Sequence, residues 1–122
     1  MTAGAHVLVI DDDEGTRQFI RIVLSQEGHQ VATAPDGAAA LEWIGQNQPD
    51  VILLDLHTPV MDGWEFARLY RQTVGPHAPI IVLTAANDPR RAAVQIGAAG
   101  FLAKPFDLDA LVTIVARNVE RS

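Results

Sequence analysis

Short apolar runs alternate with longer amphipathic segments along the whole chain. The runs are continuous rather than alternating, which is typical of strands covered on both faces, as in parallel sheets. The segments between them repeat apolar residues at helical spacing, which predicts helices. The predicted strands span residues 7–10, 30–34, 51–54, 80–83 and 101–103. The predicted helices span residues 16–26, 38–46 and 63–72, then a fourth from Asp88-Pro89 to near Gly97, and a fifth that Asp107 or Asp109 opens.

Polar residues and glycines mark the ends of several predicted helices. Asp36 can cap the second helix, and Asp88 followed by Pro89 has the pattern of an N-cap and a first-turn proline. Gly28 fits the stop of the first helix. The residues expected on buried faces are Phe19, Ile20, Val23 and Leu24 in the first helix, and Leu108, Leu111, Val112, Val115 and Val119 in the last.

This alternation of strands and helices predicts an α/β fold. Five strands alternating with five helices form a three-layer (βα)5 arrangement, with a parallel sheet, right-handed crossovers and helices on both faces. No internal repeat or linker divides the chain, so residues 1–122 are expected to form a single domain. Ligands of such open sheets bind beyond the carboxyl ends of the strands.

The composition narrows the possible functions. The net charge of −6 argues against nucleic-acid binding through the chain's own surface, which would need clustered Lys and Arg. The lack of cysteine excludes disulfides, thiol nucleophiles and thiolate metal sites. The first residues lack the pattern of a signal peptide, and the apolar runs are too short to span a membrane. A cytoplasmic protein with no membrane partner is therefore expected.

Chemically useful side chains follow four of the predicted strands. They are Asp11–Asp13, Asp55, Thr84 and Lys104. Because these strand ends share one edge of the sheet, the acids, the hydroxyl and the ammonium group are expected to converge there. Packed carboxylates repel one another, so the cluster needs a cation or protons. Lys104 and Thr84 could supply a charge and a hydroxyl donor to the oxygens of a phosphoryl group.

The acids at this edge predict a magnesium site. Carboxylate, carbonyl and water oxygens are the ligands that Mg²⁺ prefers. Asp12 and Asp55 could bind the ion directly, Asp11 could hold a metal-bound water, and the backbone carbonyl of His57 could complete the set. Asp55 could then attack phosphorus and form an aspartyl phosphate.

Four segments together carry a family resemblance. They are VLVIDDDE, VILLDLHTPVMDG, IIVLTA and GFLAKPF, in this order and at compatible spacing. Over essentially its whole length the chain resembles the receiver domain of two-component response regulators, similar to the single-domain chemotaxis regulators. The resemblance implies a flavodoxin-like fold with strand order 2-1-3-4-5 and phosphorylation of an aspartate with Mg²⁺. The implied roles fall on the acidic pair Asp11 and Asp12, the phosphoacceptor Asp55, the switch hydroxyl Thr84, the lysine Lys104, the switch aromatic Phe101 and a cis proline, Pro105.

The resemblance also implies partners. A sensor histidine kinase or a histidine phosphotransfer protein would donate the phosphoryl group to Asp55. A downstream protein would bind the surface formed by the fourth helix, the fifth strand and the fifth helix. The protein would be a monomer or a phosphorylation-dependent dimer. It would be no enzyme, apart from catalysing its own phosphorylation and dephosphorylation.

Three features depart from the family pattern. The switch aromatic is Phe101 and not tyrosine, so it has no hydroxyl to bond when it turns inward. The segment from Thr84 to Gly97 is shorter than usual by about half a turn of a helix with ~3.6 residues per turn. His57 stands at the second position after Asp55, where the side chain tends to modulate loss of the phosphoryl group to water. A histidine there could position or exclude the attacking water, or it could instead donate a hydrogen bond to the phosphoryl group.

Other interpretations of the same residues stay open. Acidic residues at the start of the first helix could simply cap it, and a helix-cap or solvated role is expected for Asp13 and Glu14. Phe101 could be plain core. A phosphatase that forms an aspartyl phosphate could use Asp11 and Asp13, although no cap insertion for a substrate is visible. A pseudo-receiver, an interaction module without switching, is the third hypothesis.

Overall fold

A computed structural model describes residues 4–85 and 87–120 of the chain. Five parallel strands form one sheet in the order β2-β1-β3-β4-β5, so the predicted flavodoxin-like topology is confirmed. The strands are β1 (His6–Ile10), β2 (Gln30–Ala34), β3 (Val51–Asp55), β4 (Ile80–Thr84) and β5 (Gly100–Ala103). The helices are α1 (Glu14–Gln26), α2 (Gly37–Ile44), α3 (Gly63–Arg71), α4 (Pro89–Ile96) and α5 (Leu108–Glu120).

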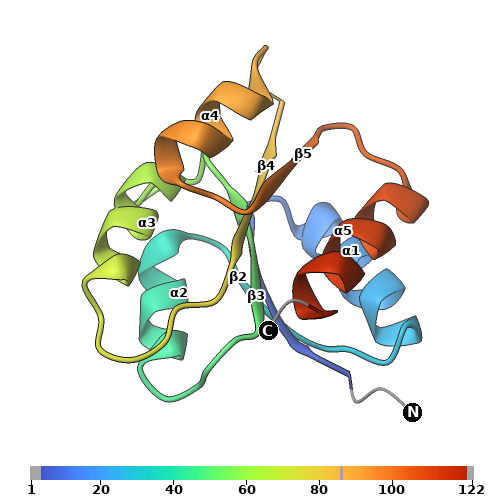
Figure 1. Cartoon of the computed structure of the whole chain (residues 1–122), viewed down its shortest axis with the longest axis horizontal. Helices are drawn as coiled ribbons and strands as arrows, with labels where there is room; N and C mark the ends of the chain where they lie inside the picture. Colours follow the sequence, from blue (N-terminus) through green and yellow to red (C-terminus); the bar gives the residue numbers. More distant parts are fainter. Residues whose placement is uncertain (1–3, 86, 121–122) are drawn as a thin grey trace.

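The helices cover both faces of the sheet (Figure 1). α2, α3 and α4 lie on one side, and α1 and α5 lie on the other. Successive residues of β1 alternate between the two resulting cores. Leu8 and Ile10 pack in the layer that contains Phe66 of α3, whereas Val7 and Val9 pack in the layer of α1 and α5. The apolar runs are continuous because each central strand has both faces buried.

An aspartate directly precedes the first residue of every helix in the described part of the chain. In each case the carboxylate accepts a hydrogen bond from the backbone N–H three residues later, as an N-cap does. This confirms the predicted caps and decides that Asp107, not Asp109, opens α5. The capping residues are Asp13, Asp36, Asp62, Asp88 and Asp107.

The predicted element boundaries need small corrections. α1 begins at Glu14, two residues before the predicted start, because Asp13 is its N-cap. α2 ends at Ile44, two residues before its predicted end. The predicted α4 is confirmed, since it runs from Pro89 to Ile96 and is capped by Gly97, which adopts a left-handed conformation with φ 75°.

Two residues predicted to be buried are not. Phe19 of α1 is 42% exposed and Leu108 of α5 is 47% exposed. Leu108 is the first residue of its helix, directly after the cap, and so lies at the rim of the core. Phe19 lies at the same rim, where its ring centroid is 6.4 Å from that of Phe106. The rest of the predicted α1 face, Ile20, Val23 and Leu24, is buried.

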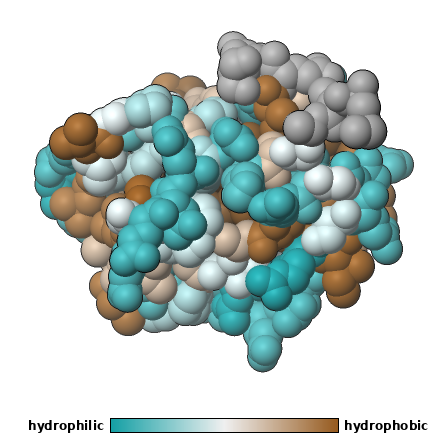
Figure 2. Space-filling model, turned by 90° about the horizontal axis from the view of Figure 1, so that it is seen from below, coloured by the Kyte–Doolittle hydropathy of each residue, from teal (hydrophilic) through white to brown (hydrophobic). Residues whose placement is uncertain are grey.

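The surface mixes polar and apolar residues. Figure 2 views the molecule from below relative to Figure 1 and shows hydrophobic residues interspersed with hydrophilic ones. Such a mixture is ordinary for a folded domain, because much of any protein surface is apolar. None of the helices in the described part of the chain has the length and hydropathy of a membrane span.

Candidate functional site

The strand register brings the candidate residues to one edge of the sheet. Ile10 of β1 pairs with Leu54 of β3, so the residues that follow, Asp11 and Asp55, lie side by side. Pairing of β3 with β4 and of β4 with β5 adds the end of each of these strands to the same edge. The expectation that the strand ends converge is met, and it follows directly from the parallel pairing.

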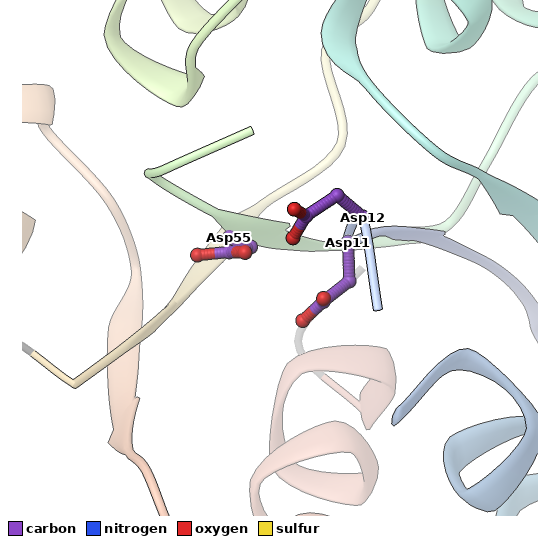
Figure 3. A group of neighbouring side chains, drawn as sticks. All are labelled: Asp11, Asp12 and Asp55. Atoms are coloured by element: carbon purple, nitrogen blue, oxygen red, sulfur yellow. The ribbon is translucent and has the colours of Figure 1, made fainter. Parts of the chain in front are cut away.

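Three carboxylates meet at this edge. Asp11, Asp12 and Asp55 each offer an oxygen, and these oxygens lie within 4.8 Å of one another. Asp11 is fully buried, Asp55 is 5% exposed and Asp12 is exposed. In Figure 3 the carboxylate of Asp12 extends from the end of β1 toward Asp55. An all-oxygen donor set with one open side fits a hard cation such as Mg²⁺.

Lys104 brings positive charge to the carboxylates. Its Nζ donates a hydrogen bond of 2.7 Å to Oδ2 of Asp11 and lies 3.6 Å from Oδ2 of Asp55. Burial lowers the pKa of Lys104, but the hydrogen bond and the charges of both aspartates outweigh it, and the net pKa is raised. The ammonium group is therefore held protonated between the two acids.

The environment of Asp55 disfavours its ionised form. Burial raises the pKa of Asp55, and the nearby Asp11 and Asp12 raise it further. The backbone N–H of His57 donates to Oδ1 of Asp55 at 3.2 Å, and this bond and Lys104 lower the pKa in part. The net shift is upward, so a bound cation would help to keep Asp55 ionised.

The raised pKa of Asp55 predicts a pH-dependent gain in stability for the variant Asp55→Asn. An unfolded aspartate has a pKa of about 3.9. The stabilising contribution of Asp55 is fully present below that value and is lost as the pH rises through the higher folded pKa. Asparagine does not ionise, so the variant is expected to gain stability relative to the unmodified chain between about pH 4 and about pH 7. Urea unfolding of both proteins at the two pH values measures this gain. An equal difference in the free energy of unfolding at both pH values would contradict the prediction.

The β1–α1 loop, defined here as Asp11–Asp13, contains a contact that the sequence analysis missed. Nη1 of Arg17 donates a hydrogen bond of 2.7 Å to the backbone carbonyl of Asp11. Asp13 has the capping role expected for it, since its Oδ2 accepts from the N–H and the hydroxyl of Thr16. A basic residue near the start of the first helix is a weak signal for this contact, because it does not show where the long side chain reaches.

Comparison with known proteins agrees with this geometry. The model of the family "Response regulator receiver domain" matches residues 7–116. The chain belongs to the response regulator receiver domain family. It is 43% identical over 118 residues to the response regulator MprA of Mycobacterium sp. (strain KMS), and 38% identical to that of Mycobacterium leprae. Each match covers 95% of this chain and 51% of the relative, so the chain spans about half the length of these curated relatives.

Solved receiver structures share the whole fold. The chemotaxis response regulator CheY4 of Vibrio cholerae superposes with a TM-score of 0.87 at 35% identity, over 94% of this chain and 98% of that one. The receiver domain of the Francisella response regulator 1452 gives a TM-score of 0.87 at 32% identity, over 97% and 98%. As a receiver domain, the chain is a phosphoacceptor switch of a two-component system.

The candidate switch residues of the receiver domain lie on β4 and β5, the two strands beyond β3 in the sheet. Thr84 is fully buried at the end of β4, and its backbone carbonyl accepts from the N–H of Lys104 at 2.9 Å. Phe101 is half-buried on β5 and packs against the core on the α4 side of the sheet. The guanidinium of Arg90 lies 6.0 Å from the Phe101 ring centroid. The peptide bond between Lys104 and Pro105 is cis, as the family resemblance implied.

The loop that follows Asp55 is tightly closed. The N–H of Gly63 donates to the carbonyl of Leu56 at 3.0 Å, and a Cβ at Gly63 would lie 2.8 Å from Leu56, so only glycine fits. Val60 has a positive φ of 67° and projects outward, 86% exposed. The side chain of His57 is exposed, whereas its N–H is held by Asp55. The backbone around Asp55 is therefore fixed, while the His57 side chain is accessible to solvent.

Proposed function

We propose that Asp55 is the residue on which this receiver domain accepts its phosphoryl group, with Mg²⁺ as cofactor. One observation carries the proposal: Asp55 lies within 4.8 Å of the oxygens of Asp11 and Asp12 and 3.6 Å from the ammonium group of Lys104. Phosphoryl transfer depends mainly on positioning and on neutralising charge. A carboxylate between a candidate cation site and an ammonium group meets both needs.

Four groups are proposed to hold the metal ion. Asp12 and Asp55 would bind it directly, with the backbone carbonyl of His57. Asp11 would act through a metal-bound water, because its Oδ1 already accepts from the N–H of Asp13 and its Oδ2 accepts from Lys104. Bound Mg²⁺ would supply positive charge that favours ionised Asp55 and offsets the charge of the incoming phosphoryl group.

The phosphoryl donor is proposed to be a phosphohistidine of a sensor histidine kinase or of a histidine phosphotransfer protein. A carboxylate oxygen of Asp55 forms the new O–P bond while the N–P bond of the donor breaks. The electron pair of that bond returns to the imidazole, which takes up a proton. Lys104 transfers its hydrogen bond from Asp11 to a phosphoryl oxygen, and the hydroxyl of Thr84 binds another.

The phosphorylation signal is proposed to leave the site through Thr84 and Phe101. Movement of Thr84 toward the phosphoryl group vacates space beside β5, and the Phe101 ring can repack there without the hydroxyl that a tyrosine would carry. The surface of α4, β5 and α5 would then change its affinity for a downstream protein. The chain would act as a monomer or as a phosphorylation-dependent dimer, in the cytoplasm, with no direct nucleic-acid or membrane partner.

The geometry favours this role over a phosphatase built on Asp11 and Asp13. Asp11 is fully buried and both of its oxygens are engaged, so it is a poor nucleophile. Hydrogen bonds from the hydroxyl and the N–H of Thr16 lower the pKa of Asp13, which therefore is a poor general acid. We thus propose that the chain is no enzyme, apart from catalysing its own phosphorylation and dephosphorylation.

The proposal is tested with a small phosphodonor. Incubation of the chain with phosphoramidate and Mg²⁺ is expected to add a single phosphoryl group, detected as an intact mass shift and located on Asp55 by peptide mapping. Chelation of Mg²⁺ with EDTA is expected to prevent the addition. Turnover of a phosphomonoester would support the phosphatase instead. An amide spectrum unchanged by beryllofluoride and Mg²⁺ would support a pseudo-receiver.

A further inference from the structure

We propose that Arg17 is a positioning residue that holds the β1–α1 loop in the shape in which Asp11 and Asp12 face Asp55. This inference rests on the proposed Mg²⁺ site and gives a role to a side chain outside the acidic cluster. It starts from the hydrogen bond of 2.7 Å that Nη1 of Arg17 donates to the backbone carbonyl of Asp11. The carbonyl belongs to the first residue of the loop, directly after the end of β1.

The contact satisfies a buried polar group. Asp11 is 0% exposed, and a buried carbonyl without a hydrogen-bond partner would be strongly unfavourable. A charged donor such as a guanidinium makes a stronger bond than a neutral one. Two more bonds hold the carboxylate of Asp11: Oδ1 accepts from the N–H of Asp13 at 2.9 Å, and Oδ2 accepts from Lys104 at 2.7 Å. The N–H of Asp11 also donates to the carbonyl of Ala34 at 3.1 Å, so the residue is held at four points.

Two side chains, Lys104 and Arg17, donate hydrogen bonds to Asp11, and the bond from Arg17 is the one expected to persist during phosphoryl transfer. Lys104 is proposed to leave Asp11 for a phosphoryl oxygen, so its bond cannot fix the loop in the phosphorylated state. Arg17 is positioned by α1 itself, since its N–H donates to the carbonyl of Asp13 at 3.1 Å in the first helical turn. Side chains on a helix point back toward its N-terminus, and this directs Arg17 onto the loop.

A holding role and a purely electrostatic role predict opposite effects on Mg²⁺ binding. Coulomb repulsion alone would make Mg²⁺ bind more tightly once a nearby positive charge is removed. Loss of the hold would loosen the loop, so that Asp11 and Asp12 no longer face Asp55, and Mg²⁺ would bind more weakly. The sign of the change in affinity therefore separates the two roles.

The experiment measures Mg²⁺ affinity of the folded variant Arg17→Met by calorimetry. Methionine keeps an unbranched apolar stem but has neither charge nor donor. The affinity is expected to fall about three- to tenfold, the range expected for loss of one hydrogen bond. Arg17→Lys, which keeps the charge and a donor, is expected to recover part of it. Arg21→Met is the matched control, because Arg21 is exposed one turn further along α1. The Mg²⁺ affinity of this variant is expected to equal that of the unmodified chain or to be slightly higher. An unchanged or higher affinity in Arg17→Met overturns the proposal.

A second measurement needs no metal. Hydrogen exchange of the Asp13 amide, which donates to Asp11, reports directly on the loop. In Arg17→Met this amide is expected to exchange faster while the amides of β3 keep their rates. Equal acceleration of both would indicate general destabilisation and would overturn the positioning role. If the unmodified chain binds no Mg²⁺, the proposed function fails, and the Asp13 amide still decides whether Arg17 holds the loop.

Discussion

Asp55→Asn is expected to abolish phosphoryl incorporation from phosphoramidate, from a single group per chain to none. The amide nitrogen and oxygen of asparagine are poor nucleophiles, and the change also removes a negative ligand from the candidate Mg²⁺ site. The variant is expected to stay folded, because the raised pKa of Asp55 means that its ionised form is disfavoured in the native state. Intact mass after incubation with phosphoramidate and Mg²⁺ measures the loss.

The matched control is Asp62→Asn, at the end of the loop that follows Asp55 and leads to α3. Oδ1 of Asp62 accepts from the N–H of Glu65 at 2.9 Å, and asparagine caps helices as well as aspartate does. This variant is expected to take up the phosphoryl group as the unmodified chain does. Incorporation by Asp55→Asn at the original yield would mean that another residue is the phosphoacceptor.

Lys104→Met is expected to slow phosphorylation by about 100- to 1,000-fold, the range found when one charge-stabilising donor is removed from an active site. The same change is expected to make Mg²⁺ bind more tightly, because the ammonium group that occupies Asp11 is gone. The free energy of unfolding is also expected to fall, since a buried carboxylate loses its partner. The loss should be smaller than the ~3–5 kcal/mol of a fully buried pair, because the Lys104 side chain is 23% exposed.

Rates at saturating Mg²⁺, together with a Mg²⁺ titration, separate these effects of Lys104. Lys104→Arg keeps the charge and is expected to retain part of the rate, although its planar fork differs from a compact ammonium group. An unchanged rate in Lys104→Met would remove Lys104 from the phosphoryl site. A loss of Mg²⁺ binding in that variant would instead assign Lys104 a role in shaping the metal site.

The fold and the proximity of the acidic residues could both be predicted from the sequence. Parallel strands that are buried on both faces appear as continuous apolar runs, and their carboxyl ends share one edge, so Asp11 and Asp55 had to lie together. The caps at Asp36 and Asp88 were also predicted, because a carboxylate before a helical pattern has a local cause.

Contacts that depend on the course of a long side chain could not be predicted. The hydrogen bond of Arg17 to the carbonyl of Asp11 is one such contact, made from the first turn of a helix that begins two residues before its predicted start. The exposure of Phe19 also escaped the helical periodicity, because this residue lies at the rim of the core, beside Phe106. Periodicity assigns a residue to a face of a helix but not to a depth in the protein.

The pairing of Lys104 with Asp11 also bears on chemoselectivity. Small acyl phosphates have two electrophilic atoms: attack at phosphorus phosphorylates the nucleophile, and attack at the carbonyl carbon acylates it. Only an unprotonated amine acylates readily, and the pairing at 2.7 Å keeps the pKa of Lys104 raised. Lys104 is also the only lysine of the chain. While Lys104 is paired with Asp11, its amine is protonated and does not attack the carbonyl carbon of an acyl phosphate. The nucleophile that remains in the site is the carboxylate of Asp55, so the reagent is directed toward transfer of its phosphoryl group.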